Sequence, residues 1–129
     1  LNFGNITTAR KQMAGVSSDV RGIFAGGGGA AIAVSNEMDY FTIATASTAG
    51  DFGDLSVARK TSAGINSDVR GVFCGGTYLT ICDYVTIATE GNATTFGDLS
   101  QTSYGGYGVS SDVRGVVTFG WTVWKYSNK

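Results

Sequence analysis

"SDVRGVFCGG", at residues 67–76, has close variants at 18–27 ("SDVRGIFAGG") and 111–120 ("SDVRGVVTFG"), so the chain contains an internal repeat. The three copies are offset by 49 and then 44 residues. Phe-Gly pairs recur at the same two offsets, at 3–4, 52–53 and 96–97. A period of this length is typical of repeat proteins, in which each copy forms one structural unit that packs on its neighbours.

Each full copy divides into four predicted strands, called a to d. In the first copy these are "KQMAGVS" (11–17), "RGIFAGG" (21–27), "MDYFTIAT" (38–45) and "FGDLSVAR" (52–59). Strand c has apolar or aromatic residues near every second position, as strands do. No window keeps a helical period, and glycine recurs too often for helices. The chain is therefore predicted to be all-β.

Four-stranded units of 40–50 residues predict the blades of a β-propeller. The pattern resembles the kelch repeat, in which a Gly-Gly pair, two aromatic residues and a closing basic residue mark each unit. The matching residues are Gly26, Gly27, Gly75, Gly76, Tyr40, Tyr84, Arg10 and Arg59. Phe52 and Phe96 stand where a kelch repeat usually has Trp, and the third copy has Ser103 at the basic position. The wording "DYVTIATEGNATTFGDL" (83–99) also resembles kelch-like repeats in structural proteins of tailed bacteriophages, marine ones especially.

The strands add up to about three blades in one chain. We expect a single propeller segment over 1–129, made of strand d of the third blade (1–10), blade 1 (11–59), blade 2 (60–103) and strands a to c of blade 3 (104–129). Three blades are too few for a ring. Two chains joined head to tail close at six blades, with residues 1–8 of each pairing with strand c of the other, near 121–127. The alternative is a fragment or a two-blade remnant.

The repeated phrase contains an aspartate and an arginine two positions apart. These pairs are Asp19 and Arg21, Asp68 and Arg70, and Asp112 and Arg114. One interpretation is a ring of arginines that binds an anion or carboxylate. The favoured interpretation is structural: each pair fixes a turn and ties one blade to the next, since a structural need recurs in every copy.

Irregular aromatic residues are the candidate ligand-binding positions. They are Tyr78, Tyr104, Tyr107, Trp121 and Trp124. Exposed aromatic rings stack on sugars or anchor protein contacts. For the two tryptophans we favour a role in the seam between subunits.

Composition bounds the chemistry of the chain. There is no histidine, which removes the commonest general base and transition-metal ligand, and a net charge of −1 gives no reason to expect nucleic acid. Cys74 and Cys82 flank a predicted hairpin; a disulfide could join them, but we expect two buried free thiols. We expect no cofactor, no metal and no membrane segment, and no enzyme, because most carboxylates recur with the repeat.

Three functions remain open at this level. The resemblance implies a structural or receptor-binding propeller of a phage particle, in a tail or host-recognition apparatus, and a virion location. A lectin-like propeller that binds a surface glycan is the alternative. A designed or reconstructed half-propeller without a natural ligand is the second alternative, because the copies are so alike.

Overall fold

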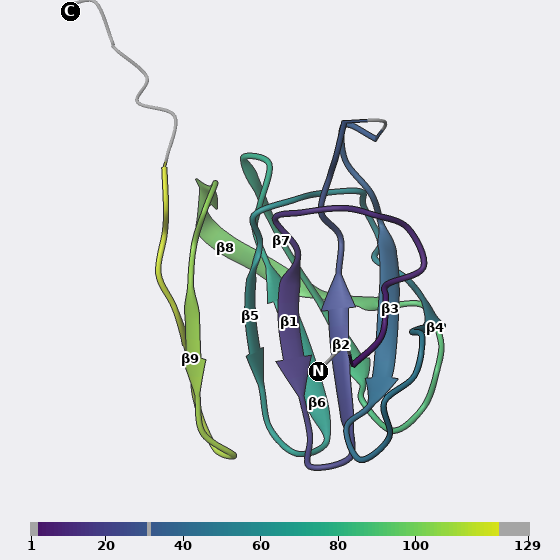
Figure 1. Ribbon diagram of the computed structural model, residues 1–129. Coiled ribbons are helices and arrows are strands. Elements are labelled where there is room, and N and C mark those ends of the chain that lie inside the picture. Colours follow the sequence, from purple (N-terminus) through teal and green to yellow (C-terminus); the bar gives the residue numbers. More distant parts are fainter. Residues whose placement is uncertain (1–2, 31, 122–129) are drawn as a thin grey trace, which may run out of the picture.

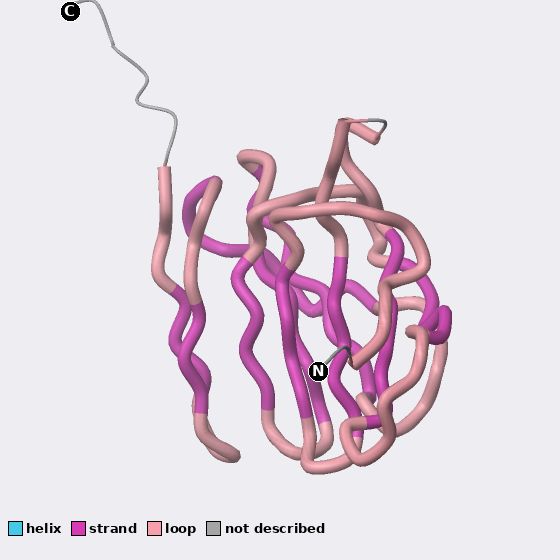
Figure 2. The backbone as a smooth tube through the Cα atoms, in the orientation of Figure 1, coloured by secondary structure: helices cyan, strands magenta, loops and turns pink. Residues whose placement is uncertain are grey.

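The computed structural model describes residues 3–30 and 32–121. This part of the chain contains strands and loops and no helix, so the all-β prediction is confirmed (Figure 2). No helix long and apolar enough to cross a membrane is found in the described residues.

Three antiparallel sheets make up the described chain (Figure 1). Sheet 1 contains β1 (Ala14–Ser17), β2 (Arg21–Ala25), β3 (Glu37–Thr42) and β4 (Gly50–Asp54). Sheet 2 contains β5 (Ala63–Asn66), β6 (Arg70–Cys74), β7 (Leu79–Thr86) and β8 (Thr94–Ser103). Sheet 3 is the hairpin of β9 (Gly108–Ser110) and β10 (Gly115–Val117). In each sheet the strands pair in chain order, so the two full copies have the same meander topology.

The two four-stranded sheets share one register shift, although β7 and β8 have a further shift between Leu79 and Ile81. In sheet 1 the pairing of β3 with β4 shifts between Met38 and Asp39, and in sheet 2 the pairing of β7 with β8 shifts between Cys82 and Asp83. These are equivalent positions, 44 residues apart. A bulge bends the strand and re-aims the local side chain. Here it accompanies an aspartate that is buried in both sheets.

The core lies between sheets 1 and 2. Alternating residues of sheet 1 face it, and every second residue of sheet 2 meets them, as the period of two requires. The buried side chains include Val16, Ile23, Met38 and Phe52 of sheet 1 with Phe73, Val85 and Ile87 around sheet 2. Full burial of one such side chain contributes about 1.5–3 kcal/mol. The two copies therefore stabilise one another across this joint.

The first strands of the three copies, β1, β5 and β9, lie side by side (Figure 1). Glycine permits this approach: a Cβ on Gly64 would meet the carbonyl oxygen of Gly15, and one on Gly108 would meet that of Gly64. Backbone bonds follow the same series, since Thr61 N–H donates to the Gln12 oxygen (2.8 Å) and Gly105 N–H to the Thr61 oxygen (3.1 Å). Each copy is thus placed on the one before it by a repeated step.

Some strands differ from their predicted extents. The fourth strand of copy 1 ends at Asp54, and residues 3–10 form no strand within this chain. Strand c of the third copy was predicted near 121–127. Of that range only Trp121 is described, and it forms an isolated bridge with Tyr104. The predicted pairing of residues 1–8 with that strand lies largely outside the described residues.

Candidate assembly surfaces

A buried ion pair links the end of copy 1 to sheet 2. Arg59 follows β4, and its Nη2 lies 2.9 Å from Oδ2 of Asp83 on β7, with both side chains fully buried. Arg59 also donates to the Phe73 carbonyl (3.2 Å), and the Ser56 hydroxyl donates to Asp83 (2.7 Å). Burial lowers the pKa of the Arg59 guanidinium, and the Asp83 carboxylate opposes that shift. The pair fixes where copy 1 meets copy 2.

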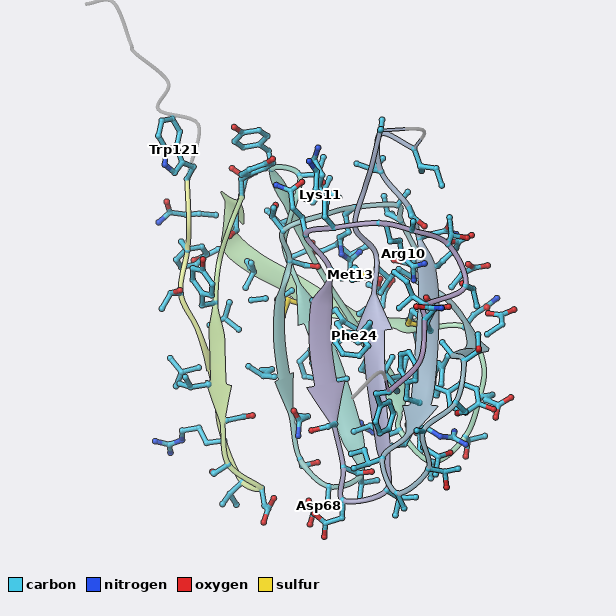
Figure 3. All side chains as sticks on the ribbon, in the orientation of Figure 1. Arg10, Lys11, Met13, Phe24, Asp68 and Trp121 are labelled. Carbon is cyan, nitrogen blue, oxygen red and sulfur yellow. A yellow bond between two sulfur atoms is a disulfide. The ribbon has the colours of Figure 1, made fainter. Side chains whose placement is uncertain are left out.

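The N-terminal segment, residues 3–10, makes the same kind of link to sheet 1. Arg10 Nη2 lies 2.7 Å from Oδ2 of the buried Asp39 on β3, and a second contact joins Arg10 to Glu37 (3.1 Å). Figure 3 shows Arg10 beside β3. From the sequence, Arg10 and Arg59 were predicted only to be closing basic residues, and neither Asp39 nor Asp83 was predicted to lie opposite them.

Two further contacts that the N-terminal segment makes with copy 1 are equivalent to contacts that β4 and the residues after it make with copy 2. Ala49 N–H donates to the Asn5 carbonyl (2.9 Å), as Ala93 N–H donates to Asp54 (2.8 Å). The Thr7 hydroxyl donates to Asp39, as that of Ser56 donates to Asp83. The segment therefore lies on sheet 1 as the end of copy 1 lies on sheet 2. No strand among the described residues pairs with it as β3 pairs with β4.

The turn of the repeated phrase is closed by serine. Ser18 N–H donates to the Arg21 carbonyl (2.9 Å), and the Ser18 hydroxyl accepts from the Arg21 N–H (3.2 Å). Ser67 makes both bonds in the second copy. In the described part of the chain, no ion pair joins the aspartate of a phrase to its arginine. These serines were not singled out from the sequence, although short hydroxyl side chains favour such turns.

The arginine of the first phrase reaches from sheet 1 to sheet 2. Arg21 donates to the Ile87 carbonyl (3.2 Å), contacts Glu90 (3.5 Å) and lies 4.3 Å above the Tyr40 ring. A hydrogen bond to Glu90 is the main cause that raises the pKa of the Tyr40 hydroxyl. In the second copy Arg70 stacks on Tyr84 at 4.4 Å. Arg114 and the aspartates Asp19, Asp68 and Asp112 are exposed.

An apolar groove of about 460 Å³ lies over the face of sheet 1 that is turned away from sheet 2. We call it the sheet 1 groove, and the N-terminal segment and residues in and beside sheet 1 line it: Phe3, Gly4, Ile6, Gly22, Phe24, Phe41 and Ile43. Phe24 is 40% exposed, whereas Phe73, its equivalent in sheet 2, is 0% exposed because sheet 1 covers it. The same contrast separates Ile43 from Ile87. Figure 3 shows Phe24 on β2, whose sheet lies in front of sheet 2.

A second free apolar face lies on the β9–β10 hairpin. Val109 and Val116 are direct cross-strand partners, so they share one face, and both are exposed. Val109 is 72% exposed, whereas Val16, its equivalent in sheet 1, is 5% exposed. In the part of the chain that the structure describes, an exposed apolar face therefore lies at each end of the series of sheets.

The candidate aromatic residues are partly brought together. Tyr78 stacks on Tyr104, with ring centroids 4.9 Å apart, and Tyr104 exchanges backbone hydrogen bonds with Trp121 (3.0 and 2.7 Å). Trp121 lies at the opposite end of the molecule from Asp68 (Figure 3). Tyr107 belongs to the same terminal segment and is exposed. Trp124 lies outside the described residues.

The expectation of two free thiols is wrong, because Cys74 and Cys82 form a disulfide. They are direct partners across β6 and β7, so pairing of the strands itself places their side chains together. In sheet 1 the equivalent pair is Ala25 and Met38, both fully buried.

Comparison with known proteins gives no family. No protein-family model matches the chain, and no curated protein matches it. In the part of the chain that the structure describes, no cluster of three or more His, Cys, Asp or Glu side chains could hold a metal ion. The function must therefore be argued from the surfaces above.

Proposed function

We propose that the chain is a non-enzymatic structural or binding module that forms a β-propeller, with its three sheets as blades. In this proposal two chains close a six-bladed ring as a homodimer. The N-terminal segment of each chain becomes strand d of the partner chain's third blade. Closure places that segment beside the partner's third blade and covers both apolar end faces.

The contacts of the N-terminal segment carry this proposal. Residues 3–10 reproduce on sheet 1 the contacts that copy 1 makes on sheet 2, including the buried pair of Arg10 with Asp39. A segment with the environment of a strand d requires a strand c beside it. In this proposal strand c of a second chain's third blade lies beside the segment.

The chemistry of the buried carboxylates supports a non-enzymatic role. Asp39 and Asp83 are the buried acids of the described chain, and each lies against a buried guanidinium. A carboxylate neutralised in this way, away from solvent, is a poor general base or nucleophile. The resemblance to phage structural repeats supports a place in a virus particle, in a tail or receptor-binding assembly.

Deleting residues 1–8 is expected to disrupt the dimer. The deletion removes the proposed strand d from both joints at once but keeps Arg10, so the pair with Asp39 remains. Light scattering at micromolar concentration should give the mass of a dimer for the intact chain, and of a monomer or an aggregate for the shortened one. Thr7→Val is the matched control, because it removes only one hydroxyl contact. A dimer that survives the deletion, or an intact chain that is monomeric, contradicts the closure.

A carbohydrate-binding function is the second candidate, and the aromatic group favours it. Tyr78 and Tyr104 are stacked next to Trp121, which is 76% exposed. Such rings offer flat faces to a sugar. On a glycan array, binding by the intact chain that is lost in Trp121→Ala and kept in Phe96→Ala supports this function. Phe96 is exposed as well but lies on β8, where its ring contacts Tyr84. An intact chain that binds no glycan excludes it.

A further inference from the structure

We propose that Val109 of one chain fills the space above Gly22 of a second, identical chain, where the β9–β10 hairpin of the first docks on the sheet 1 groove of the second. This inference rests on the proposed closure and specifies the residues of its joint. We infer it from the two interfaces within the chain, sheet 1 with sheet 2 and sheet 2 with the hairpin, because equivalent residues of successive repeats form both.

The hole in the joint is a glycine. Gly22, Gly71 and Gly115 are equivalent positions, 49 and 44 residues apart. A Cβ on Gly71 would lie 2.6 Å from Cγ2 of Val16, and one on Gly115 would meet the Ile65 side chain. A Cβ on Gly22 would meet no atom of the described residues within 4 Å. Within 3–30 and 32–121, the space that the preceding repeat occupies at the other two glycines is therefore open at Gly22.

Val109 is the residue of the third repeat that is equivalent to Val16 and Ile65. We call its side chain the knob, because it fills the space above Gly22. Val16 is buried against Gly71, and Ile65 lies against Gly115. Val109 has no following sheet among the described residues and is exposed. Phe24 and Ile43 border the open space at Gly22. The knob therefore meets apolar side chains as well as a glycine.

Polar groups along the first strands follow the same series. The Ser17 N–H donates to the Asn66 side chain (3.4 Å), and the Asn66 N–H donates to the Ser110 hydroxyl (3.0 Å). The next step of the series joins the Ser110 N–H to the Ser17 hydroxyl of a second copy. In the same way the Gly105 carbonyl of one chain accepts from the Gln12 N–H of the other. Within the chain the Gln12 carbonyl accepts from the Thr61 N–H, and the Thr61 carbonyl accepts from the Gly105 N–H.

A second chain of the same sequence fits both exposed faces. Sheet 2 packs on sheet 1 and the hairpin packs on sheet 2 in the same relative position. Repeating this relation once more places sheet 1 of a second chain on the hairpin. Both halves of that joint are present in one chain, so two copies satisfy each other reciprocally. With a net charge of −1 the copies repel each other little.

The test is an exchange of knob and hole. Gly22→Val is expected to raise the dimer dissociation constant about a hundredfold, because it overpacks both joints of the ring at once. Val109→Gly is expected to weaken the dimer, and the double variant to recover most of the affinity of the original chain. Gly71→Val is the matched control, because its side chain meets Val16 within the chain and should lower the melting temperature instead. Light scattering over a dilution series and thermal unfolding measure the two effects.

The outcomes separate this joint from the closure itself. A dimer that Gly22→Val leaves intact overturns the joint while self-association stands. A chain that is monomeric at every concentration overturns both. The proposed interface is supported if the Gly22→Val and Val109→Gly double variant recovers the dimer affinity. It is also supported if a chain with Ser17→Cys and Ser110→Cys forms a covalent dimer on oxidation.

Discussion

Arg59→Ala is expected to lower the free energy of unfolding by about 3–5 kcal/mol, the loss that follows when one partner of a buried ion pair is removed. Asp83 then keeps the bonds from Ser56 but loses the guanidinium 2.9 Å away. The Phe73 carbonyl loses its donor as well. Urea unfolding at a fixed protein concentration measures the change, since association shifts apparent stability.

The chain provides a matched control for that experiment. In the third copy, Ser103 stands at the position equivalent to Arg59, and Ser127 at that equivalent to Asp83. The double variant Arg59→Ser with Asp83→Ser removes both charges and is expected to be more stable than Arg59→Ala. Arg70→Ala removes a guanidinium that stacks on Tyr84 at the surface and should cost about 1 kcal/mol. If Arg59→Ala costs no more than Arg70→Ala, the buried pair does not hold the joint.

The order of strands was predictable from the sequence because it depends on local signals. Alternation in residues 38–45, the turn after Ser17 and the Gly-Gly pairs each act within a few residues. The offsets of 49 and 44 show that copy 1 has five extra residues, and these lie in the Gly-rich connection between β2 and β3. Strand ends were less accurate, since pairing partners decide where a ladder stops.

The buried pairs could have been found by comparing the copies with each other. Arg10 and Asp39 are 29 residues apart and Arg59 and Asp83 are 24 apart, a difference equal to the five extra residues of copy 1. The third copy replaces both members, which indicates that the two positions depend on one another. Which face of each sheet stays open could not be predicted in this way. That depends on how successive sheets stack, as the contrast between Phe24 and Phe73 shows.

The disulfide depends on register in the same way. A sequence shows that Cys74 and Cys82 flank a hairpin, but a shift of one residue turns a side chain to the other face of the sheet. Only the pairing of β6 with β7 places them opposite each other. The free-thiol expectation treated them as two separate small apolar residues.

Cys74→Ser with Cys82→Ser is therefore expected to lower the free energy of unfolding by about 2–3 kcal/mol, the value for a cross-link that closes a short loop. Thermal unfolding of the original chain with and without a reductant should show a matching loss. Titration of thiols in the native, unreduced protein should find none. Two titratable thiols, or a melting temperature that a reductant leaves unchanged, would show that the pair is not bonded.

A second double variant separates the cross-link from the packing around it. Cys74→Ala with Cys82→Met installs the pair that sheet 1 carries at the equivalent positions, Ala25 and Met38, both fully buried. It removes the covalent bond but keeps an apolar pair at a site where both cysteines are 5% exposed. We expect its stability to lie between the original chain and the serine variant, and to be insensitive to reductant. Because Phe73 faces sheet 1, the adjacent Cys74 faces the other side of sheet 2, toward the β9–β10 hairpin. If the Ala–Met pair restores full stability, packing toward the hairpin rather than the cross-link is what this position contributes.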